Sequence, residues 1–282
     1  MFTLSTISRA IRRANMARHG DLVDEELRGW NWGRAPLKPR AYFELGVSEV
    51  SYRLCPTRRD LWLRRRDGVK IEPSEAMRIG AAIHNIIHSI SSEISRLSTK
   101  GLKIWDAYTA VYRRIDRMVR EYTQNLANTE WLYSFAQATA FTLASIAAEL
   151  GLPLITEFTV DGSLLGLSKN LRIDALFQGA AVVEFKYGYN RDDYQLALTG
   201  YALALESFLE LPIDTGIAVL IANGCSELRT RVEAVYISNN LRQEFIEARD
   251  EAIDVLLSPS PPPKPSQCPQ TCPYRRVCGA PA

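Results

Sequence analysis

The segment from Arg172 to Lys186 constrains the fold of this chain more than any other. It consists of two runs of apolar and β-branched residues around a short turn that contains Gly179, which is the pattern of a β-hairpin. Side chains alternate across a strand, so Glu184 and Lys186 must share one face. A three-residue turn would place Asp174 opposite Glu184 on that face, whereas a two-residue turn would send the two carboxylates to opposite faces. The function of the hairpin therefore depends on its register.

Two carboxylates and a lysine on an apolar strand pair are costly to bury unless they have partners. A divalent cation would be one such partner, and two oxygen ligands of this kind suit Mg²⁺ or Mn²⁺. The lysine could then orient a water molecule or offset charge on a phosphate under attack. The alternative is that Asp174, Glu184 and Lys186 form a solvent-facing polar group on a one-sided sheet. So short a motif does not decide between the two.

Charge and cysteine content narrow the class of protein. The net charge is only +2 over 282 residues, so any nucleic-acid surface must be a local patch. No apolar run reaches the length of a membrane span, so no membrane contact is expected. The five cysteines are spread unevenly over a long chain, unlike the disulfide framework of a small secreted domain. The expected location is therefore the cytoplasm.

Changes in periodicity divide the chain into four regions. Residues 1–47 are expected to form an N-terminal helical extension with a basic amphipathic helix, and residues 48–150 a helical region. Residues 151–257 contain three strands, a helix, two strands and a last helix. This order predicts an α/β core in which helices flank a mixed sheet. Residues 258–282 are a Pro-rich linker followed by a cysteine-rich end.

The helical region contains two candidate functional features. A helix is predicted from Ser74, as its N-cap, to about Leu97. His84 lies at the edge of its apolar stripe and His88 lies farther toward solvent, and a histidine at a core border is more often structural than a ligand. The second feature is the one strong basic patch of the chain, which is either a solvated helix face or a surface that contacts phosphates. The patch contains Arg58, Arg59, Arg64, Arg65 and Arg66.

The C-terminal end contains Cys268, Cys272 and Cys278 within eleven residues. Clustered cysteines of this kind are typical of a metal centre, which usually needs four thiolates. The fourth is either Cys55 or Cys225. Cys55 is followed by proline, as are Cys268 and Cys272, and we interpret Cys225 as incidental. The spacing alone favours neither an iron–sulfur cluster nor zinc, and disulfides would be credible in a hyperthermophile.

Together these motifs resemble the CRISPR-associated RecB-like iron–sulfur exonucleases of the PD-(D/E)XK nuclease superfamily. The resemblance covers about residues 48–280, and the order of the motifs is much more specific than any one of them. The long N-terminal extension is most similar to the archaeal subtype I-A variant. The matching elements are Cys55, Gly80 four positions before His84, Ile173-Asp174, Glu184-Phe185-Lys186 and the three terminal cysteines.

The resemblance implies a PD-(D/E)XK (RecB-like) core with an iron–sulfur subdomain. It implies a Mn²⁺- or Mg²⁺-dependent exonuclease that degrades single-stranded DNA from 5′ ends and trims DNA for CRISPR spacer acquisition. The implied metal ligands are His84, Asp174, Glu184 and the carbonyl of Phe185, and the implied catalytic residues are Lys186, Glu184 and Asp174. The implied ligands of a [4Fe–4S] cluster, or of a [2Fe–2S] cluster, are Cys55, Cys268, Cys272 and Cys278.

Other residues match the family less closely. Glu157 occupies an acidic position often seen in the family, where it would assist with metal or water. Three residues separate Cys268 from Cys272 where two are usual. Gln195 and Tyr201 are six positions apart instead of four, and we favour Tyr201 as a DNA or active-site contact.

Two other functions agree with the same residues. One is a non-cleaving scaffold that binds DNA ends inside the integration complex, and the other is a RecB-like nuclease of DNA repair. The expected partners are single-stranded DNA or DNA ends. Proteins of the CRISPR integrase complex and a second copy of the chain are further candidates.

Overall fold

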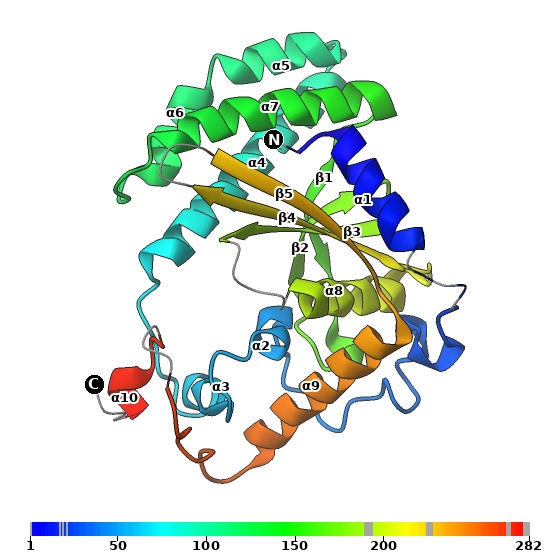
Figure 1. Cartoon of the computed structure of the whole chain (residues 1–282), viewed down its shortest axis with the longest axis vertical. Coiled ribbons are helices and arrows are strands. Elements are labelled where there is room, and N and C mark those ends of the chain that lie inside the picture. Colours follow the sequence, from blue (N-terminus) through cyan, green and yellow to red (C-terminus); the bar gives the residue numbers. More distant parts are fainter. Residues whose placement is uncertain are drawn as a thin grey trace.

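The computed structural model describes residues 2–16, 18, 20, 22–188, 194–223, 228–268 and 272–278. Over these ranges the chain forms one five-stranded sheet with helices on both faces (Figure 1). None of the described helices combines the length and the apolar character needed to cross a membrane.

The sheet is mixed, as the order of the predicted elements indicated. Strands β1, β2 and β3 form an antiparallel meander, β3 and β4 are parallel, and β4 and β5 are antiparallel. The parallel pair is joined through helix α8, because parallel neighbours require a crossover connection. The strands are β1 (Ile155–Val160), β2 (Leu171–Phe177), β3 (Ala181–Tyr187), β4 (Thr215–Asn223) and β5 (Leu228–Tyr236). Between β1 and β2, Ser163–Leu165 form a 3-10 helix.

The turn between β2 and β3 contains three residues, 178–180. Gln178 and Gly179 both have positive φ, at 52° and 66°. Phe177 pairs with Ala181, and Ala175 with Val183. The same register, continued by one residue, brings Asp174 level with Glu184. The three-residue alternative is therefore confirmed.

One face of the sheet is covered by a thick helical layer (Figure 1). Helix α4 begins after Ser74, whose hydroxyl accepts a hydrogen bond from the Met77 amide at 3.2 Å, as predicted for an N-cap. Helix α4 contacts β1 and β3 on one side and the outer helices on the other, and its isoleucines belong to the core between them. This layer contains α4 (Glu75–Thr99), α5 (Ile104–Tyr112), α6 (Ile115–Thr123) and α7 (Trp131–Leu150), and α1 (Leu4–Met16) lies beside it along β4 and β5.

The other face of the sheet is covered by α2 (Val47–Ser51), α8 (Tyr194–Leu209) and α9 (Asn239–Leu257). Below them lie α3 (Arg59–Arg65) and the short C-terminal α10 (Arg275–Cys278), side by side in Figure 1. A small third core, which contains cysteines from the C-terminal end, joins α3 to this end.

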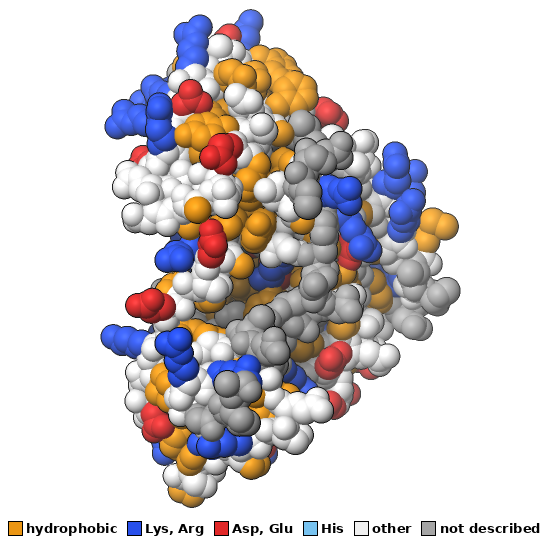
Figure 2. Space-filling model, turned by 60° about the vertical axis from the view of Figure 1, so that its left-hand side comes forward, with side chains coloured by type: hydrophobic (Ala, Val, Ile, Leu, Met, Phe, Trp, Pro, Cys, Tyr) orange, Lys and Arg blue, Asp and Glu red, His pale blue; other side chains and the backbone are white. Residues whose placement is uncertain are grey.

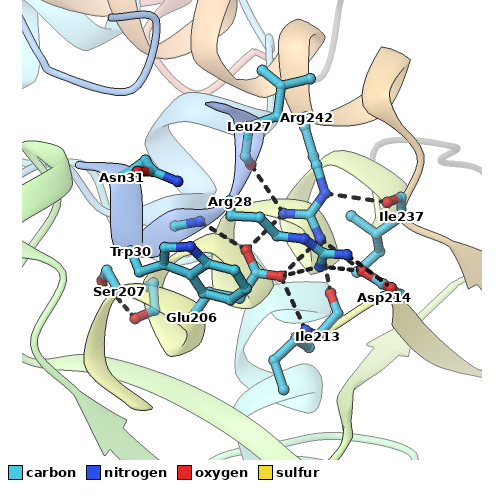
Figure 3. Close-up of polar contacts among 12 residues, drawn as sticks. Leu27, Arg28, Trp30, Asn31, Glu206, Ser207, Ile213, Asp214, Ile237 and Arg242 are labelled. Carbon is cyan, nitrogen blue, oxygen red and sulfur yellow. Dashed lines mark hydrogen bonds and ion pairs between the residues drawn. The ribbon is translucent and has the colours of Figure 1, made fainter. Parts of the chain in front are cut away.

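A buried ion network fixes the N-terminal region to the sheet and its helices (Figure 3). Glu206 of α8 accepts hydrogen bonds from Arg28 at 2.8 Å, from the Gly29 amide at 2.8 Å and from Arg242 of α9 at 2.7 Å. Asp214, directly before β4, lies 2.5 Å from Arg28 and 3.2 Å from Arg242. Glu206 and Arg242 are fully buried. The region before residue 47 is thus packed into the core through paired charges.

Candidate functional site

Asp174 lies where the regular alternation of β2 breaks. Ile173 belongs to the core on the α8 side, whereas Ala175 belongs to the core on the α4 side. Residues two apart in a strand normally share a face. In the neighbouring strand, the pairs on either side of Glu157 put it level with Asp174, and Glu157 has a φ of 53°. Non-glycine residues rarely adopt this left-handed conformation, and it is concentrated at functional sites.

His84 of α4 joins this irregular point to strand β3. Its Nδ1 atom lies 3.3 Å from a carboxylate oxygen of Asp174, and its Nε2 atom lies 2.9 Å from the carbonyl oxygen of Phe185. The Phe185 amide donates a hydrogen bond to the other oxygen of Asp174 at 2.8 Å. An imidazole, a carboxylate and a main-chain carbonyl are thereby held together. Three of the four predicted metal ligands come from this arrangement.

Glu157 is the third member of a compact group of ligand atoms. One ligand atom from each of His84, Glu157 and Asp174 lies within 4.8 Å of the other two. The carboxylate of Glu157 also forms an ion pair with Arg172 at 2.5 Å. The sequence assigned Glu157 only an assisting role. Glu157 could have been recognised as a candidate ligand because it lies level with Asp174 on the adjacent strand. Recognising this requires the pairing of β1 with β2, which the sequence alone does not give.

Glu184 lies beside this group but outside the 4.8 Å cluster of described residues. One of its oxygens, Oε1, accepts hydrogen bonds from the Tyr52 hydroxyl at 3.0 Å and from the Lys186 amine at 2.5 Å. The other oxygen, Oε2, is buried without a hydrogen-bond partner among the described residues. A carboxylate oxygen buried in this way is unfavourable unless a cation or a donor reaches it.

Electrostatics agree with a cation at this position. Burial raises the pKa of Glu184, and the positive charge of Lys186 only partly offsets this rise. Burial alone would lower the pKa of His84, but the hydrogen bond and charge of Asp174 outweigh burial, so the pKa is raised. Burial thus disfavours the charged form of Glu184 more than Lys186 compensates, and a metal ion would supply further positive charge.

A cavity of about 1050 Å³ opens beside the site. His84, Phe185 and Lys186 line one part of it, and Arg64 of α3 and Tyr274 near the C-terminal end line another. Figure 2 shows this side of the molecule hollowed between its upper and lower parts. The cavity thus connects the candidate metal site with the region that carries the arginines and cysteines.

The predicted set of DNA contacts is wrong for Arg58. This residue is only 2% exposed, and it donates hydrogen bonds to the carbonyl oxygens of Glu49 and Val50, both at 2.9 Å. It also forms an ion pair with Glu251 of α9 at 3.3 Å. A guanidinium group buried against protein carbonyls has no surface to offer a phosphate. Arg58 instead fastens α2 and α9 to the start of α3.

The other arginines of the patch differ in exposure. Arg59 is half-buried and donates to the Pro262 carbonyl, whereas Arg64, Arg65 and Arg66 are exposed. Arg64 and Arg65 form ion pairs with Glu49. The three exposed side chains stay predicted DNA contacts.

Tyr201 of α8 is partly buried against the core on the α8 side. Its pKa is raised, first by burial and then by the nearby charges of Glu184, Asp174 and Glu157. The structure therefore places Tyr201 near the acids, and its role as a DNA or active-site contact stays a prediction.

The predicted cluster cysteines lie in and around the small third core. Cys268, Cys272 and Cys278 pack with Trp62 and Leu63 of α3. Leu54, directly before Cys55, joins the same core. Burial raises the pKa of the Cys272 thiol to about 11, and this thiol contacts that of Cys268.

The four thiols are free and are not gathered around a single point. Cys55 is buried, and its sulfur lies 3.4 Å from the hydroxyl of Thr57. Among the described residues, no three cysteine sulfurs lie within 4.8 Å of one another. Cys225 falls outside the described residues. The fold thus brings Cys55 and the three C-terminal cysteines to one region, but their four sulfurs do not surround a common point.

Comparisons with known proteins agree along the whole chain. The family described as "CRISPR-associated exonuclease Csa1" matches residues 1–281. A CRISPR-associated exonuclease Csa1 of Thermoproteus tenax is 37% identical over 290 aligned positions, covering 99% of each chain. Its counterpart from Saccharolobus solfataricus is 33% identical over 273 positions, covering 91% of this chain and 92% of that protein. The chain therefore belongs to the Csa1 family of CRISPR-associated exonucleases.

Proposed function

We propose that this chain is a metal-dependent deoxyribonuclease that hydrolyses phosphodiester bonds at the ends of single-stranded DNA. The observation that carries the proposal is the interlocked contact among His84, Asp174 and the main chain of Phe185, next to the unpaired buried oxygen of Glu184. The arrangement agrees with a PD-(D/E)XK nuclease core. The family's description as exonucleases supports the same reaction.

The residues present fit a divalent cation. His84, Asp174, Glu184 and the carbonyl of Phe185 would hold it, and Glu157 is close enough to assist. Oxygen ligands suit both Mg²⁺ and Mn²⁺, and the imidazole nitrogen favours Mn²⁺. A cation held by these residues would supply Lewis-acid polarisation of the scissile phosphate and a source of hydroxide near neutral pH.

The side chains around the cation have separate tasks. Lys186 borders the cavity, where its ammonium group can face an oxygen of the phosphate under attack. Glu184 holds that ammonium at 2.5 Å, and Asp174 fixes the imidazole of His84. Arg64, Arg65 and Arg66 would contact the DNA backbone without reading bases.

We further propose that Cys55, Cys268, Cys272 and Cys278 bind an iron–sulfur cluster, [4Fe–4S] or [2Fe–2S]. Four free cysteines, three of them packed against α3, provide the soft thiolate donors that such clusters take. The cluster would join the C-terminal end to the start of α3, beside the proposed path of the DNA.

The proposed cellular role is the trimming of DNA for CRISPR spacer acquisition, with cleavage from 5′ ends and in contact with proteins of the integrase complex. Support comes from the description of both relatives as CRISPR-associated exonucleases. A non-cleaving scaffold for DNA ends is the alternative that the following experiment separates.

The test uses single strands labelled at the 5′ or the 3′ end, incubated with the full chain in Mn²⁺, Mg²⁺ or EDTA. We expect progressive loss of the 5′ label as mononucleotides or short fragments with Mn²⁺ or Mg²⁺, and no cleavage in EDTA. Lys186→Ala should abolish cleavage and leave DNA binding intact, because the ammonium stabilises charge that develops only during the reaction. Undiminished cleavage by Lys186→Ala, or binding without cleavage by the wild type, would contradict the proposal.

A further inference from the structure

One tyrosine contacts two residues of the proposed catalytic group in two different ways. The hydroxyl of Tyr52 donates a hydrogen bond to Oε1 of Glu184 at 3.0 Å. The ammonium nitrogen of Lys186 lies over the ring of the same tyrosine, 4.6 Å from its centroid. Since Lys186 also lies 2.5 Å from that oxygen, the three side chains form a closed triangle.

The backbone that carries Tyr52 is firmly anchored. Tyr52 ends helix α2, and Val47, Val50 and Ser51 of this helix are buried. Glu49 accepts a hydrogen bond from the Gly46 amide at 2.7 Å, which closes the first turn of the helix. The tyrosine ring therefore reaches the sheet from a backbone that is held in place by the buried residues of α2.

The triangle restricts both catalytic side chains. A lysine side chain loses much rotamer freedom when its amine is held in one place, and an aromatic face together with a carboxylate fixes that place. Both donors attach to Oε1 of Glu184, which leaves Oε2 without a partner among the described residues. Tyr52 thus directs one oxygen toward the protein and leaves the other for a ligand.

We propose that Tyr52 is a positioning residue that holds the Lys186 ammonium and turns the Glu184 carboxylate for the reaction. This inference rests on the proposed nuclease function. Neither composition nor spacing pointed to Tyr52, because its role depends on the packing of α2 against α8 and α9, which brings the tyrosine to residues of β3 far away in the sequence.

The kinetic test compares Tyr52→Phe, which removes only the hydroxyl, with Tyr52→Leu, which also removes the ring. Tyr42→Phe is the matched control, because Tyr42 is 59% exposed. A hydrogen bond to a charged group supports a loss of about tenfold in kcat for Tyr52→Phe, and the added loss of the ring contact about a hundredfold for Tyr52→Leu. KM and the Kd for single-stranded DNA should stay within about twofold, since Tyr52 acts on the catalytic residues and not on DNA.

A second readout requires neither metal nor activity. Lysine amines of the metal-free protein are reductively methylated with ¹³C-formaldehyde and a borane reductant, and the Lys186 signal is identified by its absence in Lys186→Arg. The ring current of Tyr52 should move this signal upfield in the wild type and in Tyr52→Phe. The signal should return to the ordinary lysine position in Tyr52→Leu.

The two readouts separate failure of this proposal from failure of the nuclease function. If the wild type cleaves and both Tyr52 variants keep kcat within about twofold, the positioning role is refuted. A raised KM with unchanged kcat would make Tyr52 a DNA contact and refute it equally. If the wild type does not cleave with any metal, the nuclease function falls. The Lys186 signal then tests the contact alone: an ordinary position in the wild type overturns the inference, and an upfield position that Tyr52→Leu abolishes supports the hold of Tyr52 on the Lys186 ammonium.

Discussion

His84 is the side chain through which metal binding at the proposed site should depend on pH. Both of its ring nitrogens are engaged, one by Asp174 and the other by the Phe185 carbonyl. Burial would lower its pKa, but the hydrogen bond and charge of Asp174 outweigh burial and raise the pKa. Histidine binds metals only in its neutral form. In the metal-free protein, protons should therefore compete for the site at pH values above the ordinary histidine pKa of about 6.5.

The affinity for Mn²⁺ should accordingly rise with pH, and much of the rise should occur above about pH 6.5. The imidazolium–carboxylate contribution to folding has the opposite sign. It is fully present below that pH and is lost as pH rises through the raised pKa of His84. Calorimetric titration of the metal-free protein with Mn²⁺ across this range measures the slope.

His84→Gln should flatten this dependence. The matched control is His88→Gln, because His88 lies one turn farther along α4 and bonds to Thr156 at 2.9 Å, outside the ligand group. Equal slopes for wild type and His84→Gln would show that another group controls metal binding.

At the scale of elements, periodicity in the sequence predicted most of the fold. The N-cap at Ser74, the meander of β1 to β3 and the alternation of α8, β4, β5 and α9 all follow from local patterns. The turn length could not be decided, because Gly179 suits either hairpin and register depends on pairing. The break in β2 at Asp174 and the left-handed Glu157 arise from contact between distant strands and α4, which no local pattern encodes.

The arginines before residue 67 also show that the sequence does not reveal which side chains the fold buries. The basic run before residue 67 looks uniform in the sequence, yet Arg58 is buried and Arg66 is exposed. The difference comes from α9, whose packing over α2 and α3 covers one side chain and not the other. The buried ion network of Arg28, Glu206 and Arg242 could not be predicted from the sequence either, because its members are far apart in the chain and meet only in the fold.

This network offers a stability test at the scale of elements. Glu206→Gln removes the only carboxylate that contacts Arg28, Arg242 and the Gly29 amide together among the described residues. Asp214 still pairs with both guanidinium groups, but loss of the fully buried one of their two acids should lower the free energy of unfolding by about 3 kcal/mol. Denaturant unfolding measures this change, with the exposed Glu247→Gln of α9 as control. A loss no larger than that of the control would show that the network does not hold the N-terminal region in place.

At the scale of the whole molecule, segments near both ends of the chain pack on the rest of the described fold. Helix α1 packs on β4 and β5, and the cysteine-bearing end packs on α3 beside the cavity. The Cys-Pro motif shared by Cys55, Cys268 and Cys272 favoured Cys55 as the fourth ligand, which would bring the C-terminal end to the start of α3. Contact between the C-terminal end and α3 is thus a property of the described fold, and the proposed cluster would make it permanent.

Cysteine replacement tests this arrangement. Purified without oxygen, the wild type should be brown, with about four irons per chain if the cluster is [4Fe–4S]. Cys272→Ser should lose iron and expose the linker after residue 257 to proteases, whereas Cys225→Ser should keep the wild-type content. Colourless wild-type protein with one zinc ion would overturn the cluster assignment and leave the nuclease site untouched.

The most direct test of the account is anomalous diffraction from crystals of the full chain soaked in MnCl₂. We predict a manganese peak bounded by His84, Asp174 and Glu184, with the imidazole released from the Phe185 carbonyl and with Oε2 of Glu184 facing the ion. Well-ordered crystals without a peak at this position, and with His84 still bonded to that carbonyl, would contradict the metal-dependent nuclease site.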